Sequence, residues 1–253
     1  MNFKDSLFQI EPTDYCNLKC VMCMPQKEKR EIHGNKHKGY LNIQLFKRIL
    51  ESIRTHDMYF GTALMHWIGE PFLHKDYLIM LKCILACESN FGIIRCDTNF
   101  NMVTKEMIDQ LLGIATKKLH ITLSLDATAA EVYSHIRVGG DFDRVISNII
   151  YLIDQRRLRK SRGPTLNFQF VVQDLNHHQT EKFVSFWSQY LSINAEGFGD
   201  MISLMRQSVG TGGPQQDRAD RLYDEVIGKL NIKDTVNGIK VCTMSETSWG
   251  EDG

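Results

Sequence analysis

Strand patterns alternate with helix patterns over most of the chain. Short apolar or alternating runs predict six strands, over Leu7–Thr13, Ala63–Ile68, Ile93–Asn99, Lys118–Asp126, Thr165–Gln173 and Ala195–Gly199. Helical spacing predicts a helix from near Asn42, then helices over Tyr77–Cys87, Lys105–Leu112, Ala129–Arg137 with Phe142–Arg157 as one interrupted helix, and Gln179–Leu191. This order is typical of parallel βαβ units with helices on the outer face of the sheet, and it predicts an α/β fold.

The predicted strands carry polar side chains along one face. In Lys118–Asp126 the apolar residues alternate with a polar set, His120, Thr122, Ser124 and Asp126. A closed eight-stranded barrel fills its interior with branched apolar side chains, so a polar face indicates an open, partial barrel around a wet cavity. An antiparallel sheet with one solvated face is the alternative, which the intervening helices disfavour.

Three cysteines follow the first predicted strand in one short loop. Cys16, Cys20 and Cys23 have the spacing C-x-x-x-C-x-x-C, and no fourth cysteine follows nearby. A zinc site or an ordinary iron–sulfur site takes four protein ligands. Three thiolates around a four-iron cluster would leave one iron open, and an open iron can bind and act on a small molecule.

This cysteine spacing, directly after a first strand, resembles the radical S-adenosylmethionine (SAM) superfamily. The resemblance implies a [4Fe-4S] cluster on Cys16, Cys20 and Cys23, with the amino and carboxylate groups of SAM on the open iron. It implies reductive cleavage of SAM to a 5′-deoxyadenosyl radical that abstracts hydrogen from a substrate. It also implies a partial (β/α)6 barrel similar to a TIM barrel, in agreement with the polar strand face.

Two further segments resemble motifs of the same family. Gly69, Glu70 and Pro71 follow the second predicted strand and resemble its GGEP motif, with Ile68 in place of the first glycine. The resemblance implies that this segment holds the amino group of SAM. Asn99 belongs to a match with the T-N-G turn, in which Phe100 stands in place of the glycine.

Four other residues are candidate SAM contacts on the same resemblance. Ser124 and Asp126 end the fourth predicted strand and Arg137 precedes a pair of glycines, which implies ribose and carboxylate contacts for them. The planar guanidinium of Arg137 suits a carboxylate because it can bind both oxygens. Met22 precedes the last cysteine, where the family's backbone meets adenine.

Each of these residues also has a simpler interpretation. The cysteines could be buried thiols, or a zinc site completed by a distant histidine such as His33. The segment 69–71 could be a plain turn, Arg137 could complement a helix dipole, and Asp126 could only order the strand end. The sequence does not single out a catalytic acid or base among four candidates, Glu11, His66, Asp97 and His120.

Composition narrows the partners and the compartment. The 30 basic residues balance the 30 acidic residues, so net charge favours neither nucleic acid nor an anionic membrane. We expect no signal peptide and no membrane span. The seven cysteines, grouped in ligand-like spacing, fit a reducing cytoplasm better than a disulfide framework. A basic run predicts a solvated surface over Arg156, Arg157, Arg159, Lys160 and Arg162.

The C-terminal part suggests a division near residue 200. We expect the barrel in residues 1–200 and an extension in residues 201–253, with a glycine-rich crossing over Ser208–Gln216. The segment 241–253, which contains Cys242, resembles the opening of a SPASM or twitch domain. In that branch later cysteines bind auxiliary clusters, and none follows Cys242 here, so we expect a truncated version of a longer chain.

Together these observations predict a radical SAM enzyme. The SPASM-like segment favours a peptide or protein side chain as substrate, and a dehydrogenase or epimerase of a sugar or other small metabolite is the alternative. We expect an electron donor such as a flavodoxin or ferredoxin. Two other classes stay open: an electron-transfer iron–sulfur protein would show no spectral change with SAM, and a zinc-stabilised binding module would be colourless.

Overall fold

The computed structural model describes residues 2–23, 39–194, 197–208, 213–230 and 235–244. The chain forms two compact units. Unit 1 consists of Met1–Asn17, Met24–Thr122 and Ser147–Thr165, and unit 2 of Leu18–Cys23, Leu123–Ile146 and Leu166–Gly253. The chain passes from unit 1 to unit 2 inside the cysteine segment, between Asn17 and Leu18. The predicted division near residue 200 stays a prediction.

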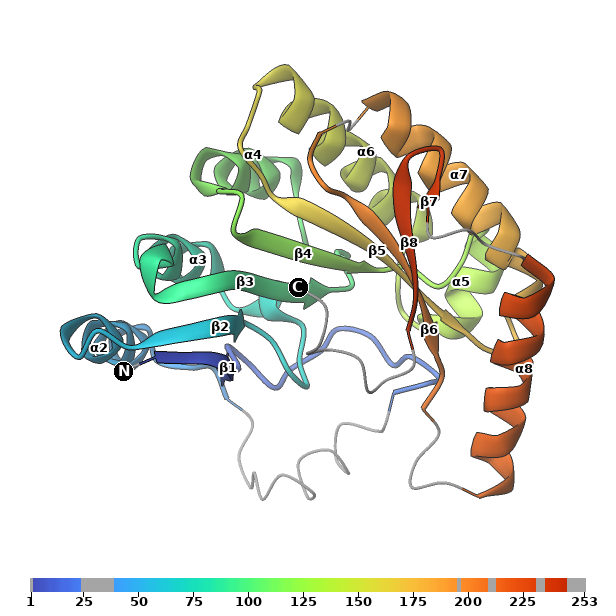
Figure 1. Ribbon diagram of the computed structural model, residues 1–253, viewed down its shortest axis with the longest axis horizontal. Coiled ribbons are helices and arrows are strands. Elements are labelled where there is room, and N and C mark those ends of the chain that lie inside the picture. The colour runs from blue at the N-terminus through green and yellow to red at the C-terminus, as the bar shows by residue number, and fades with distance from the viewer. Residues whose placement is uncertain (1, 24–38, 195–196, 209–212, 231–234, 245–253) are drawn as a thin grey trace. The chain divides into compact units, whose positions relative to one another are not determined.

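Unit 1 is built on parallel strands. The strands β1 (Asn2–Gln9), β2 (Tyr59–Leu64) and β3 (Phe91–Thr98) pair in parallel, side by side in Figure 1. The next strand, β4 (Leu119–Ser124), begins in this unit, where the Ile94 N–H donates to the Lys118 carbonyl at 2.7 Å. The connections contain α2 (Ile43–Thr55), η1 (Pro71–Leu73), α3 (Tyr77–Leu85), η2 (Glu88–Asn90) and α4 (Lys105–Ile114).

The helix starts in unit 1 follow the sequence signals. The Asn42 side chain accepts hydrogen bonds from the N–H groups of the first turn of α2, and Thr104 accepts one from the Met107 N–H at 3.3 Å at the start of α4. These are the N-cap contacts that short polar side chains provide. On α2 the buried residues are Phe46, Leu50 and Ile53, whose spacing puts them on one helix face.

Unit 2 is also built mainly on parallel strands. Just after β4, the Leu125 N–H donates to the Gln169 carbonyl of β5 (Thr165–Val172) at 3.1 Å. Strand β5 pairs in parallel with β6 (Met201–Arg206), and β6 pairs in parallel with β8 (Ile239–Met244). A short strand, β7 (Thr235–Val236), forms an antiparallel hairpin with β8, drawn in red in Figure 1. The helical segments are α5 (Ala130–Ile136), α6 (Phe142–Leu158, shared with unit 1), η3 (His177–Gln179), α7 (Thr180–Asn194) and α8 (Pro214–Leu230).

The strand order is β1-β2-β3-β4 within unit 1 and β4-β5-β6-β8-β7 within unit 2, with the first part of β4 in unit 1 and its end in unit 2. Helices and mostly parallel strands alternate along the chain, which confirms the α/β class. None of the helices within the described ranges is long and apolar enough to span a membrane.

Several predicted boundaries differ from the structure. The predicted sixth strand is wrong: Gly197 and Gly199 have φ of +84° and +72° in a turn, and β6 begins only after Asp200. That aspartate is buried, and its Oδ1 accepts the N–H of Leu166 in β5 at 2.8 Å, so it fixes the strand start. Ala195 and Glu196 lie outside the described residues. The interrupted helix is two helices, α5 and α6, separated at Gly139, whose φ is +91°.

The basic run at the end of α6 is solvated except for its first member. Arg156 is fully buried, and its Nη1 donates to the Pro164 carbonyl at 2.5 Å. It follows the buried Leu152 and Ile149 at helical spacing, so it lies on their inward face. The remaining four basic residues are exposed, as predicted.

The C-terminal strand joins the same sheet. Cys242 lies opposite Ser203 in the β6–β8 pairing. Residues 209–212 of the predicted crossing lie outside the described residues, as does the SPASM-like segment from residue 245 onward.

Phe100 gives the turn after β3 an unusual backbone. Its φ is +59°, in the left-handed region where the T-N-G pattern has glycine. A residue with a Cβ atom is destabilised there by roughly 1–2 kcal/mol. The Phe100 ring is fully buried and meets Phe72 edge-on, with centroids 6.2 Å apart. The turn therefore keeps a glycine-like geometry without glycine, and burial of the ring offsets the backbone strain.

We predict that Phe100→Gly is more stable than Phe100→Ala by about 1 kcal/mol, because only glycine adopts positive φ without strain. Both variants lose the buried ring and should be less stable than the parent by about 3–5 kcal/mol. Urea unfolding followed by circular dichroism measures the difference. An alanine variant as stable as the glycine variant would contradict the strained geometry.

Candidate active site

The segment that leads to the first cysteine is fixed in unit 1. The Thr13 hydroxyl donates to the Gly39 carbonyl at 2.9 Å and accepts the Tyr15 N–H at 3.2 Å. Asp14 Oδ1 accepts the Gly39 N–H at 3.0 Å. Cys16, half-buried, follows this anchored stretch at once.

Gly69 packs against the same stretch. A Cβ atom on Gly69 would lie 2.0 Å from the Thr13 carbonyl oxygen and 2.6 Å from that of Tyr15. The next residue, Glu70, donates its N–H to the Tyr15 carbonyl at 2.7 Å. Gly69, the second glycine position of the motif, therefore makes the close approach, and the turn tolerates Ile68 at the first position.

Glu11 holds this turn from the other side. Its Oε1 accepts the N–H groups of Ile68 at 2.6 Å and Gly69 at 2.9 Å. The carboxylate thus ties the chain after β1 to the turn after β2. Among the four acid–base candidates, Glu11 therefore has a structural role, because its carboxylate accepts two backbone hydrogen bonds from the turn after β2.

Glu70 joins the turn after β2 to the end of β3. The side chain is buried; Oε1 accepts the Thr98 hydroxyl at 2.6 Å and the Phe72 N–H at 3.2 Å, and Oε2 accepts the Asn99 N–H at 2.7 Å. Pro71 begins η1, where a residue without an N–H is well tolerated.

Asn99 lies beside the first cysteine. Its Nδ2 donates to Asn17 Oδ1 at 3.0 Å and lies 3.8 Å from Cys16 Sγ, as a donor to that sulfur. Its Oδ1 accepts the Asn101 N–H at 2.9 Å, which fixes the amide plane. Sequence reasoning missed Asn17, whose only signal is an amide directly after a cysteine.

The other two cysteines belong to unit 2, where their segment pairs with the end of α5. The Lys19 N–H donates to the Val138 carbonyl and the Val21 N–H to the Ile136 carbonyl, each at 2.9 Å. A turn follows, in which the Cys23 N–H donates to the Cys20 carbonyl at 3.0 Å. Cys20 is buried and Cys23 exposed, and Met22 between them is half-buried.

Arg137 lies beside the second cysteine. Its Nε donates to Asp126 Oδ2 at 2.7 Å, its Nη2 forms an ion pair with the same oxygen, and its Nη1 donates to Cys20 Sγ at 3.7 Å. Burial lowers the pKa of Arg137, but Asp126, Cys20 and Cys23 outweigh it and raise the pKa well above its usual range. The guanidinium is therefore a permanent buried cation.

Asp126 orders the end of β4. It is fully buried with φ of +59°, and its Oδ1 accepts the Val171 N–H at 2.6 Å. Its carbonyl accepts Asn176 Nδ2 at 2.8 Å. Burial raises the pKa of Asp126, and Arg137 and the Val171 N–H oppose that rise. Ser124, half-buried at the strand end, makes no hydrogen bond through its hydroxyl with the described part of the chain.

Three remaining acid–base candidates lie with Arg95 in unit 1. Arg95 donates to Asp97 twice, from Nε to Oδ1 at 2.7 Å and from Nη2 to Oδ2 at 2.5 Å. His66 Nε2 lies 3.2 Å from Asp97 Oδ2. The Asp97 N–H donates to His66 Nδ1 at 3.2 Å, so His66 Nε2 carries the hydrogen. Burial raises the pKa of Asp97, but His66 and Arg95 outweigh it and bring the pKa below its usual range.

His120 differs from the other candidates. Burial, with Arg95 nearby, lowers its pKa, so the imidazole is neutral at pH 7. It is half-buried and makes no hydrogen bond with the residues that the structure describes. Glu11, His66 and Asp97 are engaged with protein groups, and His120 is the candidate whose ring nitrogens have no such partner there.

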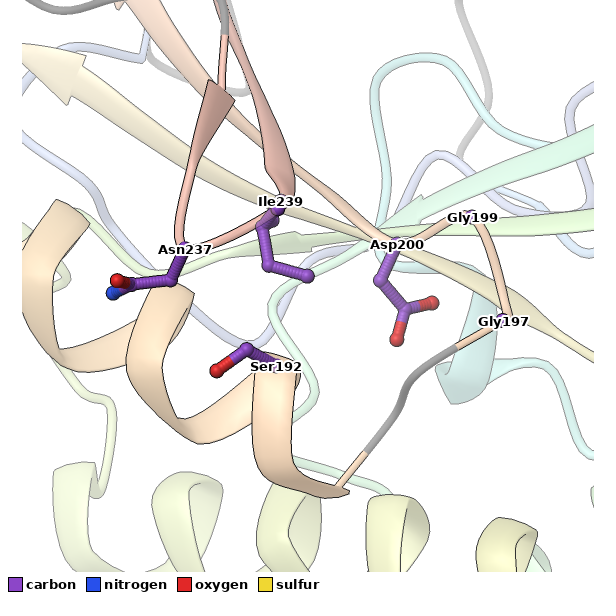
Figure 2. A pocket seen from close by; sticks show the side chains of 7 residues that line it. Ser192, Gly197, Gly199, Asp200, Asn237 and Ile239 are labelled. Carbon is purple, nitrogen blue, oxygen red and sulfur yellow. The ribbon is translucent and has the colours of Figure 1, made fainter.

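Two cavities among the described residues are lined by residues other than the cysteines and their hydrogen-bond donors. One of about 190 Å³ lies in unit 2 between the end of α7, the turn before β6 and the β7–β8 hairpin, and Asp200 lines it (Figure 2). It adjoins the amino end of β6, whereas ligands of parallel sheets bind at the carboxyl ends. A second, of about 520 Å³, lies in unit 1 between residues 40–43 and 73–76.

The donor set fits an iron–sulfur cluster. The described structure places Cys16, Cys20 and Cys23 in no disulfide, and two of their sulfurs receive N–H hydrogen bonds from Asn99 and Arg137, the kind of hydrogen bond that cluster sulfurs receive. Over the described ranges, no three His, Cys, Asp or Glu side chains converge as ligands of a single metal ion. A four-iron cluster binds each thiolate at a separate iron, so it needs no such convergence.

Comparison with known proteins agrees with this chemistry. The family model of the Radical SAM superfamily matches residues 10–186. The chain is 25% identical over 234 residues to the tungsten-containing aldehyde ferredoxin oxidoreductase cofactor-modifying protein of Pyrococcus furiosus, covering 90% of this chain and 57% of that protein. It is 25% identical over 226 residues to the mycofactocin maturase MftC of Mycobacterium tuberculosis, covering 87% of this chain and 51% of MftC.

A solved structure supports the fold. The crystal structure of Streptococcus suis SuiB bound to its precursor peptide SuiA aligns with a TM-score of 0.60 at 16% identity, covering 94% of this chain and 48% of SuiB. The predicted partial barrel is thereby confirmed as the fold class. The chain spans about half the length of the curated relatives it matches. With a family model that covers most of its length, the chain belongs to the radical SAM superfamily, whose cofactors are a [4Fe-4S] cluster and SAM.

Proposed function

We propose that the chain cleaves SAM at a [4Fe-4S] cluster held by Cys16, Cys20 and Cys23, and abstracts hydrogen from a peptide or protein side chain. One observation carries the proposal: the three-cysteine segment has a family-motif residue at two of its sulfurs, Asn99 at Cys16 and Arg137 at Cys20. A cluster bound there would supply, once reduced, the electron that breaks a C–S bond of SAM. The protein residues orient the reactants and exclude water.

The candidate SAM contacts divide into two kinds. The first kind offers backbone or side-chain atoms at the strand ends and in the cysteine turn, and it consists of Gly69, Ser124 and Met22. The Ser124 hydroxyl can bind a ribose because it forms no hydrogen bond with the described residues. The second kind holds the surrounding turns in place and consists of Glu70, Pro71, Asn99, Asp126 and Arg137. Arg137 also supplies the cation for the SAM carboxylate.

The substrate class rests on two observations. The segment 241–253 resembles the start of a SPASM domain, and the fold matches SuiB, which was crystallised with a precursor peptide. A small metabolite or cofactor is the alternative substrate, because the relative from P. furiosus is a cofactor-modifying protein. We further propose a flavodoxin or ferredoxin as electron donor and a cytoplasmic location, where cysteine ligands stay reduced.

Anaerobic reconstitution tests the chemistry. With iron and sulfide the protein should take up about four irons per chain, and dithionite with SAM should then give 5′-deoxyadenosine. Cys20→Ala should abolish this product, whereas Cys83→Ala, at a cysteine on α3 outside the motif, should retain it. A bound cluster without 5′-deoxyadenosine would indicate an electron-transfer protein, and a colourless zinc protein would indicate a binding module.

Gly69→Ala tests the close approach at the site. The added Cβ would clash with two backbone carbonyls, so the turn must move. We expect a loss of iron content and at least a tenfold fall in the rate of 5′-deoxyadenosine formation, equivalent to about 1.4 kcal/mol. Gly113→Ala on α4, where a Cβ meets nothing within 4 Å, is the matched control. Wild-type iron and rate in Gly69→Ala would refute the packing argument.

The substrate class has its own test. Peptides encoded by short reading frames beside the gene are incubated with the reconstituted enzyme, and mass spectrometry follows peptide mass while chromatography follows 5′-deoxyadenosine. A peptide substrate should raise 5′-deoxyadenosine formation and change in mass. Stimulation by small metabolites and by none of the peptides would favour the alternative.

A further inference from the structure

We propose that Arg137 and Asn99 are positioning residues that set the reduction potential of the cluster, each by donating an N–H hydrogen bond to a cysteine sulfur while a buried carboxylate holds it in place. This role is separate from any contact of these residues with SAM. It rests on the cluster proposed above at Cys16, Cys20 and Cys23, and it concerns the electron-transfer step that precedes substrate chemistry, so it does not depend on the substrate class.

The first set of contacts, which we call the first relay, runs from Asp126 through Arg137 to Cys20 and lies wholly in unit 2. Asp126 receives the Val171 N–H on Oδ1 and the Arg137 guanidinium on Oδ2, so both carboxylate oxygens have partners. The Nε and Nη2 edge of Arg137 faces this carboxylate, which leaves Nη1 directed at Cys20 Sγ, 3.7 Å away. All three side chains are buried, so solvent screens the cation from the sulfur only weakly.

The second relay runs from Glu70 through Asn99 to Cys16 and lies wholly in unit 1. Glu70 accepts the Asn99 backbone N–H at 2.7 Å and the Thr98 hydroxyl at 2.6 Å. The Asn101 N–H on Asn99 Oδ1 then orients the amide so that Nδ2 is the atom facing Cys16 Sγ at 3.8 Å. The donor here is neutral, whereas the donor in the first relay is a cation.

The two relays have the same electrostatic consequence. A reduced cluster carries one more negative charge than an oxidised one, so N–H donors and cations at its thiolates stabilise the reduced form and raise its reduction potential. Removal of either donor should make the cluster harder to reduce. Arg137 should have the larger effect because its removal also deletes a full charge.

The test compares variants of the full reconstituted chain by potentiometric titration, with the EPR signal of the reduced cluster as the readout. Arg137→Gln and Asn99→Leu should shift the midpoint potential to more negative values, Arg137→Gln by more. Arg137→Lys keeps the charge and should lie between Arg137→Gln and the parent. Asn99→Asp replaces the donor with a negative charge and should exceed Asn99→Leu.

Two buried residues outside the relays provide matched controls. Arg156→Gln removes a buried arginine that donates to the Pro164 carbonyl, and Asn148→Leu removes a buried amide that donates to the Val103 carbonyl. Both should leave the midpoint potential unchanged while they lower stability. A potential shift in these controls as large as in the relay variants would overturn the proposal.

The remaining outcomes are also decisive. Parent-like potentials in Arg137→Gln and Asn99→Leu, with full iron content, would overturn the proposal. If Arg137→Gln does not hold iron, Asn99→Leu decides alone, and a parent-like potential there would have the same meaning. Formation of 5′-deoxyadenosine by the parent protein is scored separately, so a failure of the proposed function is distinguished from a failure of the relays.

Discussion

The cysteine segment depends on backbone hydrogen bonds from neighbouring turns, because between Cys16 and Cys23 it forms neither helix nor strand. In unit 1 the turn at Gly69 and Glu70 closes onto the carbonyls that precede Cys16, and only a residue without a side chain fits there. In unit 2 the end of α5 pairs with Lys19 and Val21. Each such bond contributes about 1 kcal/mol, so several together are needed to order the segment.

Buried carboxylates organise the site. Glu70, after β2, accepts hydrogen bonds on both oxygens from groups at the end of β3. Asp126, after β4, accepts one from Val171 of β5 and one from Arg137 at the end of α5. An ionised carboxylate without partners is destabilised by several kcal/mol in a protein interior, so these groups hold their neighbours in one arrangement. Their location at the carboxyl ends of parallel strands is where connecting loops converge, which is why distant parts of the sequence meet through them.

The polar face of the strands is less uniform than alternation suggests. Asp97 is committed to Arg95 and His66 in an interlocked set of hydrogen bonds, whereas His120 on β4 stays a neutral imidazole in the same unit. Side chains at equivalent positions on the polar face thus differ in whether they already have hydrogen-bond partners in the described structure. This difference depends on which residues lie opposite one another on neighbouring strands. The pairing of Leu64 with Arg95, for example, places the residues after β2 beside β3.

The sequence was enough to predict the α/β class, the order of the main helices and strands, the cysteine spacing and the motif residues, because these depend on local periodicity and short spacings. It did not determine that Arg156 is buried, that β6 begins after Asp200, or that Phe100 adopts a left-handed backbone. Nor could it assign partners to Glu70 or Arg137, since Asn99 lies 29 residues and Cys20 117 residues away along the chain. Such pairings form only when the chain folds, because a hydrogen bond depends on distance in space and not on separation in sequence.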